Sequence, residues 1–308
     1  MTSGGATEAI GGSCAPELVE GGRAKVNLTL RVIGRRLDGF HELESVVAFA
    51  DCADRLSLDV AGQLRLQISG PLAQDCGEVA DNLVLKAAQL LRERVADLKI
   101  GSFTLHKVLP VAAGVGGGSA DAAAALRLLA RANGLSLDDA RLIEVARLTG
   151  ADVPVCVGSR ACVMTGVGET LLPLALPELP GVLVNPRVPV ATRDVFEALG
   201  LRNGELLVGA TDVIQAFAWP ADGASTADWI EALAAGTNDL EDPAIGIQPI
   251  VGEVLSALRA ADGARLVRMS GSGATCFAIF DSAGAAQAAW QSIQAAHPQW
   301  WVHAGVLS

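Results

Sequence analysis

Alternating hydrophobic and polar residues dominate the first part of the chain. The alternation over residues 24–33 predicts a half-buried strand, and a turn follows at 35–39. Similar apolar or alternating runs predict further strands at residues 46–49, 55–60, 63–69 and 103–109. Short strands separated by turns predict a sheet in this part of the chain.

Apolar residues at helical spacing predict three helices in the same half. The first begins at Asp81, a suitable N-cap, and runs to about residue 95. The second runs from Ser119 to Asn133-Gly134, because glycine commonly ends a helix. The third covers residues 137–149 and has one apolar face.

A proline turn separates these helices from the rest of the chain. Pro154 is expected to keep Val153 out of helical geometry and to hold Asp152 at a turn. Beyond it we expect a hairpin at 161–165 and 170–172, strands at 181–185, 266–269 and 275–280, and helices at 192–199, 227–235, 250–261 and 283–296. Strands and helices that segregate in this way predict an α+β protein of two domains with a cleft between them.

The most informative segment joins the strand at 103–109 to the helix at Ser119. Four of the five residues at 114–118 are glycine, so the backbone can adopt positive φ and approach a ligand closely. The following helix directs unpaired N–H groups and its positive dipole end at this loop, as phosphate sites do. The segment lacks the lysine of a Walker loop and the third glycine of a dinucleotide fingerprint. It predicts a phosphate loop of another kind, or, taken alone, a flexible linker.

Composition narrows the possible partners. The chain has 308 residues, 51% of them hydrophobic, and a formal net charge of −11. This charge argues against nucleic acid or a membrane surface as a partner, since both attract clustered Lys and Arg.

The six cysteines and four histidines form no metal-binding or disulfide pattern, which favours reduced thiols and a cytoplasmic location. Residues 1–22 are expected to be a flexible tail rather than a signal peptide, and no apolar run has transmembrane length.

Two charged residues are candidates for chemistry. Asp152 in its turn suits a general base that takes a proton from a substrate hydroxyl beside a phosphoryl donor, or an aspartate that braces the turn. Lys25, in a strand, is either a solvent-facing lysine or a cation that stabilises charge on a transferring phosphoryl group. A second glycine-rich turn at 270–274 and the pair Phe40-His41 carry little information alone.

Taken in order, these motifs resemble the GHMP superfamily of small-molecule kinases, which includes galactokinase, homoserine kinase, mevalonate kinase and phosphomevalonate kinase. The resemblance rests on the lysine-bearing strand, Pro-x-x-x-Gly-x-Gly-Gly-Gly-Ser from Pro110, Gly-Ala-Asp-Val-Pro at 150–154 and Ser-Gly-Ser-Gly-Ala at 270–274. Segments 25–28, 34–43, 114–123 and 237–241 are similar to the branch that acts on a cytidine diphosphate-linked methylerythritol in non-mevalonate isoprenoid synthesis. The resemblance covers nearly everything after residue 22.

The resemblance implies a fold and an activity. It implies a ribosomal-protein-S5-domain-2-like ATP-binding domain at 23–178 and a ferredoxin-like α+β domain at 179–308, with the active site in the cleft. The implied reaction is ATP-dependent phosphorylation of the 2-hydroxyl of the cytidyl substrate, giving the 2-phosphate and ADP. Mg²⁺ is the expected companion of ATP, and the protein is expected to be a monomer or homodimer.

The resemblance also implies roles for individual residues. Asp152 would be the base and Lys25 its partner. The substrate would contact Asn27, Phe40, His41, Thr192 and Phe196, with His41 at the cytosine end and the base between the two phenylalanines. Lys107 and Asn82 would line the adenine pocket, Ser119 is a possible Mg²⁺ contact, and the loop around the triphosphate would comprise Pro110, Val111, Ala112, Ala113, Gly114, Val115, Gly116, Gly117, Gly118, Ser119 and Ala120.

Two departures from the family pattern and two alternatives remain. The chain contains no tyrosine, so Phe40 replaces the usual tyrosine and keeps only its stacking face. Val155-Cys156 replaces an aromatic residue after the catalytic turn.

A sister kinase for homoserine or a mevalonate-type substrate would lack the cytosine pocket, and a catalytically silent nucleotide-binding regulator would not need both Asp152 and Lys25.

Overall fold

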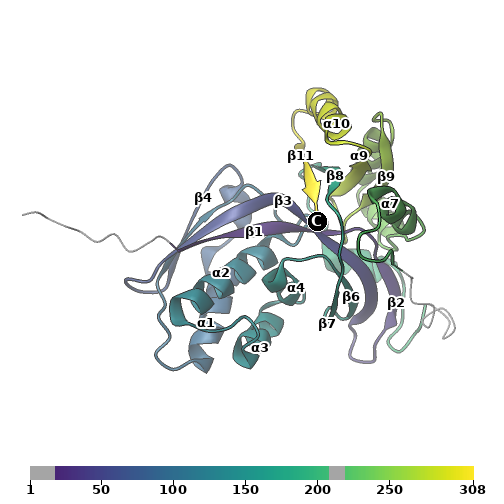
Figure 1. The fold of residues 1–308 in the computed structure, drawn as a ribbon. Helices are drawn as coiled ribbons and strands as arrows, with labels where there is room; N and C mark the ends of the chain where they lie inside the picture. Colours follow the sequence, from purple (N-terminus) through teal and green to yellow (C-terminus); the bar gives the residue numbers. More distant parts are fainter. Residues whose placement is uncertain (1–17, 208–218) are drawn as a thin grey trace, which may run out of the picture.

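A computed structural model describes residues 18–207 and 219–308. Residues 1–17, which include most of the predicted tail and Cys14, lie outside the described residues. The described part contains a mixed sheet of 11 strands, in which the main order is β4-β5-β3-β11-β8-β10-β9. Figure 1 shows the N-terminal helices on one side of this sheet and the C-terminal helices at the other end of the molecule.

The longest strand, β3 (His41–Asp59), connects most of the sheet. It pairs with β1 (Leu18–Asn27), β2 (Arg31–Arg35), β5 (Ser102–His106), β6 (Cys162–Gly166) and β11 (Trp301–Leu307). The prediction of two separate strands here was wrong. The chain stays extended through its polar middle because Ala53 and Asp54 pair with Arg23 and Gly22 of β1, partners that no local pattern can indicate. Just before it, Phe49 exchanges two backbone hydrogen bonds with Ser308.

The first predicted strand is also divided differently. β1 begins at Leu18, so residues 18–22, predicted as tail, pair with β3 instead. The predicted strand at 24–33 is interrupted, because the N–H group of Leu30 donates to Thr237 O at 2.8 Å rather than to a neighbouring strand. The chain then resumes as β2.

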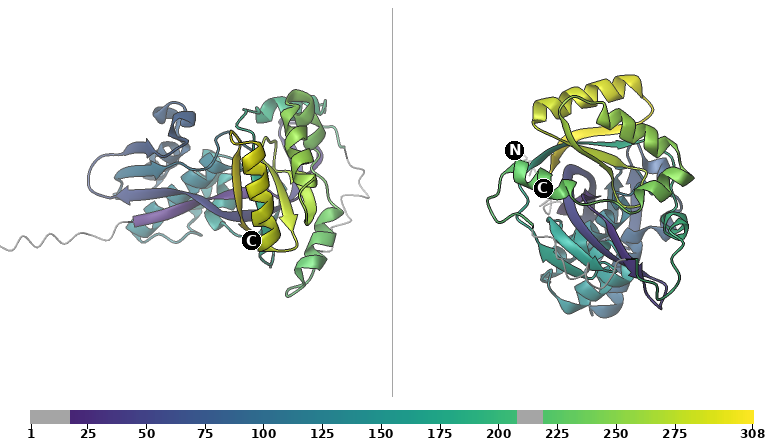
Figure 2. Two further views of the ribbon diagram at one scale, coloured as in Figure 1. Left: turned by 90° about the horizontal axis from the view of Figure 1, so that it is seen from above. Right: turned by 90° about the vertical axis from the view of Figure 1, so that its right-hand side faces the viewer.

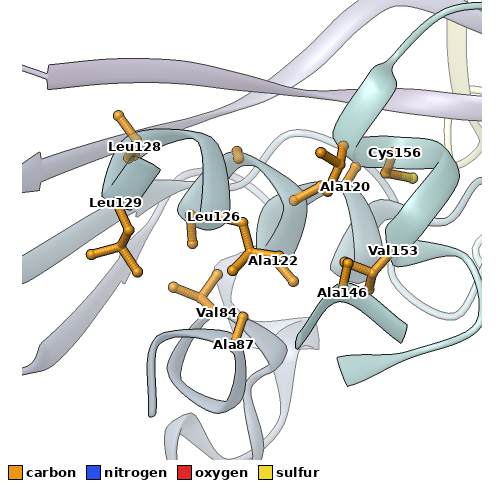
Figure 3. Packing of buried hydrophobic residues seen from close by; sticks show 14 of the residues in the cluster. Val84, Ala87, Ala120, Ala122, Leu126, Leu128, Leu129, Ala146, Val153 and Cys156 are labelled. Atoms are coloured by element: carbon orange, nitrogen blue, oxygen red, sulfur yellow. The ribbon is translucent and has the colours of Figure 1, made fainter. Parts of the chain in front are cut away.

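Four helices cover the N-terminal sheet: α1 (Leu83–Arg94), α2 (Gly117–Asn133), α3 (Ala140–Thr149) and α4 (Val153–Gly158). Figure 3 shows the small residues of α2, such as Ala122, next to Val84 and Ala87 of α1. These small side chains allow the helices to pack closely. Strands β6 and β7 (Thr170–Pro173) pair with each other and form the predicted hairpin. Strand β4 (Arg65–Ser69) lies at one edge of the sheet.

Several predicted helix starts were wrong. The helices predicted from Ser119 and from residue 137 begin at Gly117 and Ala140. Asn82, not Asp81, caps α1, because its side chain accepts the N–H of Val84 at 2.9 Å. Val153 is the first residue of α4 rather than an extended residue. Pro154 is tolerated beside it, since the N–H groups of a first helical turn have no partner within the helix.

The C-terminal half adds the antiparallel strands β8 (Leu179–Asn185), β9 (Ala264–Met269) and β10 (Cys276–Phe280). Its helices are α5 (Thr192–Ala198), α7 (Thr226–Ala234), α8 (Glu241–Ile247), α9 (Ile250–Arg259) and α10 (Ala283–Ala296). Figure 2 shows α10 packed over these strands, opposite the N-terminal helices. The predicted helix at 283–296 is confirmed, whereas α8 and β11 were missed. No helix in the described ranges is long and apolar enough to span a membrane.

The packing of α2 generates a first prediction. Leu126 of α2 is fully buried against the neighbouring elements, so Leu126→Ala should lower the free energy of unfolding by about 2–5 kcal/mol. Leu137→Ala is the matched control, because Leu137 is 44% exposed. Urea unfolding followed by circular dichroism measures both, and equal losses would contradict the assignment of this core.

Candidate active site

A cavity of about 390 Å³ lies between the two halves of the molecule. It is lined by residues from the glycine loop, β1, α5 and the C-terminal glycine turn. Residues that we predicted as site residues and that line it are Lys25, Asn27, Ala112, Ala113, Gly114, Gly116, Gly117, Gly118, Ser119, Asp152, Thr192 and Phe196. The structure therefore brings together most of the predicted site from widely separated segments.

The backbone of the glycine loop has the predicted geometry at two positions. Gly114 and Gly116 have φ values of 75° and 60°, which favour glycine. Gly117 already belongs to α2. Ala120 N–H donates to Gly116 O at 2.8 Å, so the N–H groups at 117–119 precede the helical hydrogen bonds and are left for a ligand.

Of the predicted loop residues, four lie outside the described lining of the cavity: Pro110, Val111, Val115 and Ala120. Val115 anchors the loop instead, since its carbonyl accepts the N–H of Lys25 at 2.9 Å. Ala120 is buried in the helical core. Val115 and Ala120 therefore support the loop rather than forming its cavity face, whereas Val111 is exposed.

The C-terminal glycine turn interlocks with this loop. Ser270 Oγ donates to Gly114 O at 3.0 Å and accepts the N–H of Asn27 at 3.0 Å. Any side chain at Gly114 would collide with the backbone of Ser270 and Gly273. Taken alone, this turn carried little information in the sequence, and it gained weight only as one of the motifs that together resemble the GHMP kinases.

Lys25 and Asp152 form an ion pair inside the cavity. The distance from Lys25 Nζ to Asp152 Oδ1 is 2.9 Å, and the side chains are 5% and 37% exposed. A β-carbon at Gly116 would lie 3.4 Å from Lys25 Cε and 3.8 Å from Asp152 Oδ2. The loop backbone thus passes next to a partly exposed carboxylate, where a phosphate and a proton acceptor would be neighbours.

Other polar groups that line the cavity are partly unpaired. Asn27 donates its Nδ2 to Ser45 Oγ at 2.7 Å, but its buried Oδ1 has no hydrogen-bond partner among the described residues. Thr192 Oγ1 lies 2.9 Å from Ser272 Oγ. An unpaired buried acceptor favours a ligand that donates a hydrogen bond, such as a hydroxyl group.

The aromatic arrangement differs from the prediction. His41, not Phe40, stacks on Phe196, with ring centroids 4.5 Å apart and planes at 28°. His41 itself is not among the described residues that line the cavity. Phe40 is 63% exposed and is not among the described cavity residues. The expected pair of phenylalanines around a base is absent from the described residues, because the hairpin of β2 and β3 points the Phe40 ring into solvent. Burial, aided by Arg35, lowers the pKa of His41 and favours its neutral ring.

Lys107 and Asn82 do not line the cavity formed by the described residues. The Lys107 ammonium is buried between two carboxylates, 2.5 Å from Asp54 Oδ2 and 2.7 Å from Asp121 Oδ2. Burial alone would lower the pKa of Lys107, but the two carboxylates outweigh it and raise that pKa. For the Asp121 carboxyl, burial has the opposite effect and raises the pKa, because burial disfavours the charged form of each group. Asn82 is engaged as the cap of α1.

The oxygen atoms around the loop suit a hard cation that retains most of its coordinated water. No group of three His, Cys, Asp or Glu able to hold a metal occurs within residues 18–207 and 219–308. Ser119 and Asp152 nevertheless place oxygen atoms on the cavity wall. Oxygen donors of this kind, few in number, fit Mg²⁺ bound mainly through phosphate groups.

Comparisons with known proteins agree with this geometry. The GHMP kinase N-terminal domain matches residues 82–160, and the GHMP kinase C-terminal domain matches residues 221–299. A 4-diphosphocytidyl-2-C-methyl-D-erythritol kinase of Bradyrhizobium diazoefficiens is 70% identical over 95% of this chain and 99% of its own. One from Nitrobacter winogradskyi is 68% identical over 96% of each chain.

Solved structures agree in fold. A crystal structure of 4-(cytidine 5'-diphospho)-2C-methyl-D-erythritol kinase is 35% identical, covers 94% of this chain and 99% of its own, and has a TM-score of 0.70. A homoserine kinase from Cytophaga hutchinsonii has a TM-score of 0.67 at 17% identity, and covers 97% of each chain. The second similarity concerns the fold alone.

Gly116 and Gly134, two of the glycines with left-handed φ, generate a paired prediction. Gly116 has a φ of 60° beside the ion pair, whereas Gly134 has a φ of 64° at the end of α2 with nothing within 4 Å. Alanine at either position should strain the backbone by about 1–2 kcal/mol. Only Gly116→Ala should also weaken ATP binding, by about tenfold, because its methyl group enters the cavity. Titration calorimetry with ATP measures this, and equal affinities of the two variants would contradict a phosphate loop here.

Proposed function

Because the chain belongs to the GHMP kinases and, among them, to the 4-diphosphocytidyl-2-C-methyl-D-erythritol kinases, we propose that the cavity between its two halves is the site of that reaction. The chain is a small-molecule kinase that uses ATP. It phosphorylates the 2-hydroxyl of 4-diphosphocytidyl-2-C-methyl-D-erythritol, giving the 2-phosphate and ADP, in non-mevalonate isoprenoid precursor biosynthesis. The ion pair of Lys25 and Asp152 beside the glycine loop is the observation that carries the location of the site.

Asp152 and Lys25 are proposed to act on the reacting hydroxyl. The substrate oxygen attacks the γ-phosphorus of ATP, the bond to the bridging oxygen of the β-phosphate breaks, and ADP leaves with that electron pair. Asp152 accepts the hydroxyl proton. Lys25, 2.9 Å from Asp152, holds this carboxylate in place and adds positive charge near the transferred group.

The glycine loop is proposed to bind the triphosphate. Its support is the unpaired N–H groups at 117–119, the positive end of α2 and the close approach allowed at Gly114 and Gly116. Mg²⁺, held mainly by the phosphates and contacted by Ser119, would neutralise charge on the phosphate oxygens. With no lysine at the end of the loop, the backbone carries most of the phosphate recognition.

The other end of the cavity is proposed to bind the cytidyl group. Phe196 presents a ring to the cavity, and His41, held against that ring, offers a neutral imidazole with one donor and one acceptor. Thr192 and the unpaired Oδ1 of Asn27 are further polar contacts. A contact from Phe40 would need its exposed hairpin to move toward the cavity.

Further proposals concern the setting of the reaction. The five described cysteines are free thiols, which suits the cytoplasm. The acidic net charge of −11 disfavours nucleic acid and anionic membranes as partners. We retain a domain boundary between 178 and 179, which is compatible with the separate N- and C-terminal family matches, and either a monomer or a homodimer.

Asp152→Asn tests the catalytic assignment. It keeps the shape of the side chain but removes the acceptor charge, so turnover should fall by about 10²-fold or more while ATP affinity changes little. Asp281→Asn is a matched control, because Asp281 forms a surface ion pair with Arg265 at 2.7 Å. A coupled assay of ADP release with the cytidyl substrate, homoserine and mevalonate measures turnover and substrate choice. Near-wild-type turnover of Asp152→Asn would remove Asp152 from the mechanism.

Phe196→Ala tests the cytidyl end. One stacking contact with a base is worth about 1–3 kcal/mol, so KM for the cytidyl substrate should rise about tenfold with little change in KM for ATP. Phe40→Ala is the comparison, because its exposed ring lies outside the described lining and should change KM less. A larger effect at Phe40, or an ATP-specific defect at Phe196, would place the base elsewhere.

A further inference from the structure

A buried group of three charges lies behind the glycine loop. Asp54 comes from β3, Lys107 from the segment after β5, and Asp121 from the second turn of α2. Their exposed fractions are 0%, 2% and 2%. Buried charges are costly unless they are paired, and these three pair with one another. The catalytic assignment above uses none of them as a ligand contact.

Asp54 fixes the chain where the loop begins. Its Oδ1 accepts the backbone N–H groups of Val108 at 2.6 Å and Leu109 at 2.9 Å, while its Oδ2 accepts from Lys107 Nζ. One carboxylate of the central strand therefore holds three consecutive residues. A charged acceptor makes each of these hydrogen bonds stronger than a neutral one would.

Lys107 connects Asp54 to the start of α2. A β-carbon at Gly117 would lie 3.2 Å from Lys107 Nζ, so the ammonium lies against the first residue of the helix. Asp121, one helical turn further on, accepts from the same ammonium at 2.7 Å. The first turn of α2 is thus tied to β3 from the side that faces the core.

We propose that Lys107, held between Asp54 and Asp121, positions the phosphate loop: it fixes the first turn of α2 against β3, so that the N–H groups at 117–119 keep their direction toward the triphosphate. This inference rests on the proposed function, because it takes the loop as the ATP site. Lys107 is a positioning residue, since its side chain acts through Gly117 and Asp121 rather than on the ligand. Loss of the tether affects ATP in the ground state and the transition state alike, so it raises KM for ATP and leaves kcat nearly unchanged.

Two truncations and a conservative variant test the tether. Lys107→Met leaves two buried carboxylates facing each other, and Asp121→Ala leaves a neutral pair of Lys107 and Asp54 on a helix that favours alanine. Both should raise KM for ATP, by about tenfold and about threefold respectively, with unchanged KM for the cytidyl substrate. Lys107→Arg keeps the charge and should restore KM for ATP toward the wild-type value. If Lys107→Met does not fold, Asp121→Ala decides the question.

Arg127→Met is the matched structural control. Arg127 ties a later turn of α2 to β1 and α4, through Glu20 at 3.0 Å and Cys156 O at 2.8 Å. This variant should lower the melting temperature without changing KM for ATP. The same pattern in Lys107→Met and Asp121→Ala would overturn the proposal, because it would make the three charges merely structural.

Two further results are decisive. A lower KM for ATP in Asp121→Ala would also overturn the proposal, since it would show that the network acts only through its net negative charge. Direct calorimetry with ATP alone separates this inference from the proposed function. Wild-type protein that binds ATP but does not phosphorylate the cytidyl substrate would contradict the function, whereas active wild-type protein with unaltered variants would contradict only the tether.

Discussion

The hydrogen-bonding pattern of β3 is the constraint on which the rest of the structure depends. Its register with β1 shifts between Arg23 and Lys25, so that Arg23 faces Ala53 while Lys25 faces Phe49. At this irregularity the chain end joins the sheet through Phe49 and Ser308. The free edge of β1 at Lys25 then bonds to the glycine loop. One strand thereby connects both halves of the sheet and brings the lysine next to the loop.

The site depends equally on contact between the two halves. Ser270, from the C-terminal turn, bonds to the carbonyl of Gly114 and to the N–H of Asn27. The absence of a side chain at Gly114 is what allows this turn to approach. The glycine loop is therefore contacted from both sides, by Lys107, which pairs with Asp54 of the central strand, and by Ser270 of the C-terminal turn.

The distribution of charge around the glycine loop differs from the overall charge of the chain. The net charge of −11 belongs to the whole sequence, and salt screens exposed charges beyond about 8–10 Å. Close to the loop, the N-terminal end of α2 presents positive potential at short range, and Lys25 adds a cation that is paired with Asp152. Lys107 lies just behind them but is balanced by two carboxylates. In the proposed site, short-range donors and loop geometry, rather than the overall charge, would govern phosphate recognition.

The sequence by itself determined the local elements and the chemical types of the site residues. The glycine loop, the helix after it and the helix at 283–296 follow from short-range patterns, because φ preferences, capping and helical periodicity act within a few residues. The pairing of Lys25 with Asp152 was expected only from the family resemblance, because the two residues are 127 positions apart. The tertiary structure alone decided the continuity of β3, the exposure of Phe40 and the burial of Lys107 between Asp54 and Asp121. The continuity of β3 and the burial of Lys107 depend on partners more than ten residues away in sequence, whose pairing energy appears only when the sheet is assembled.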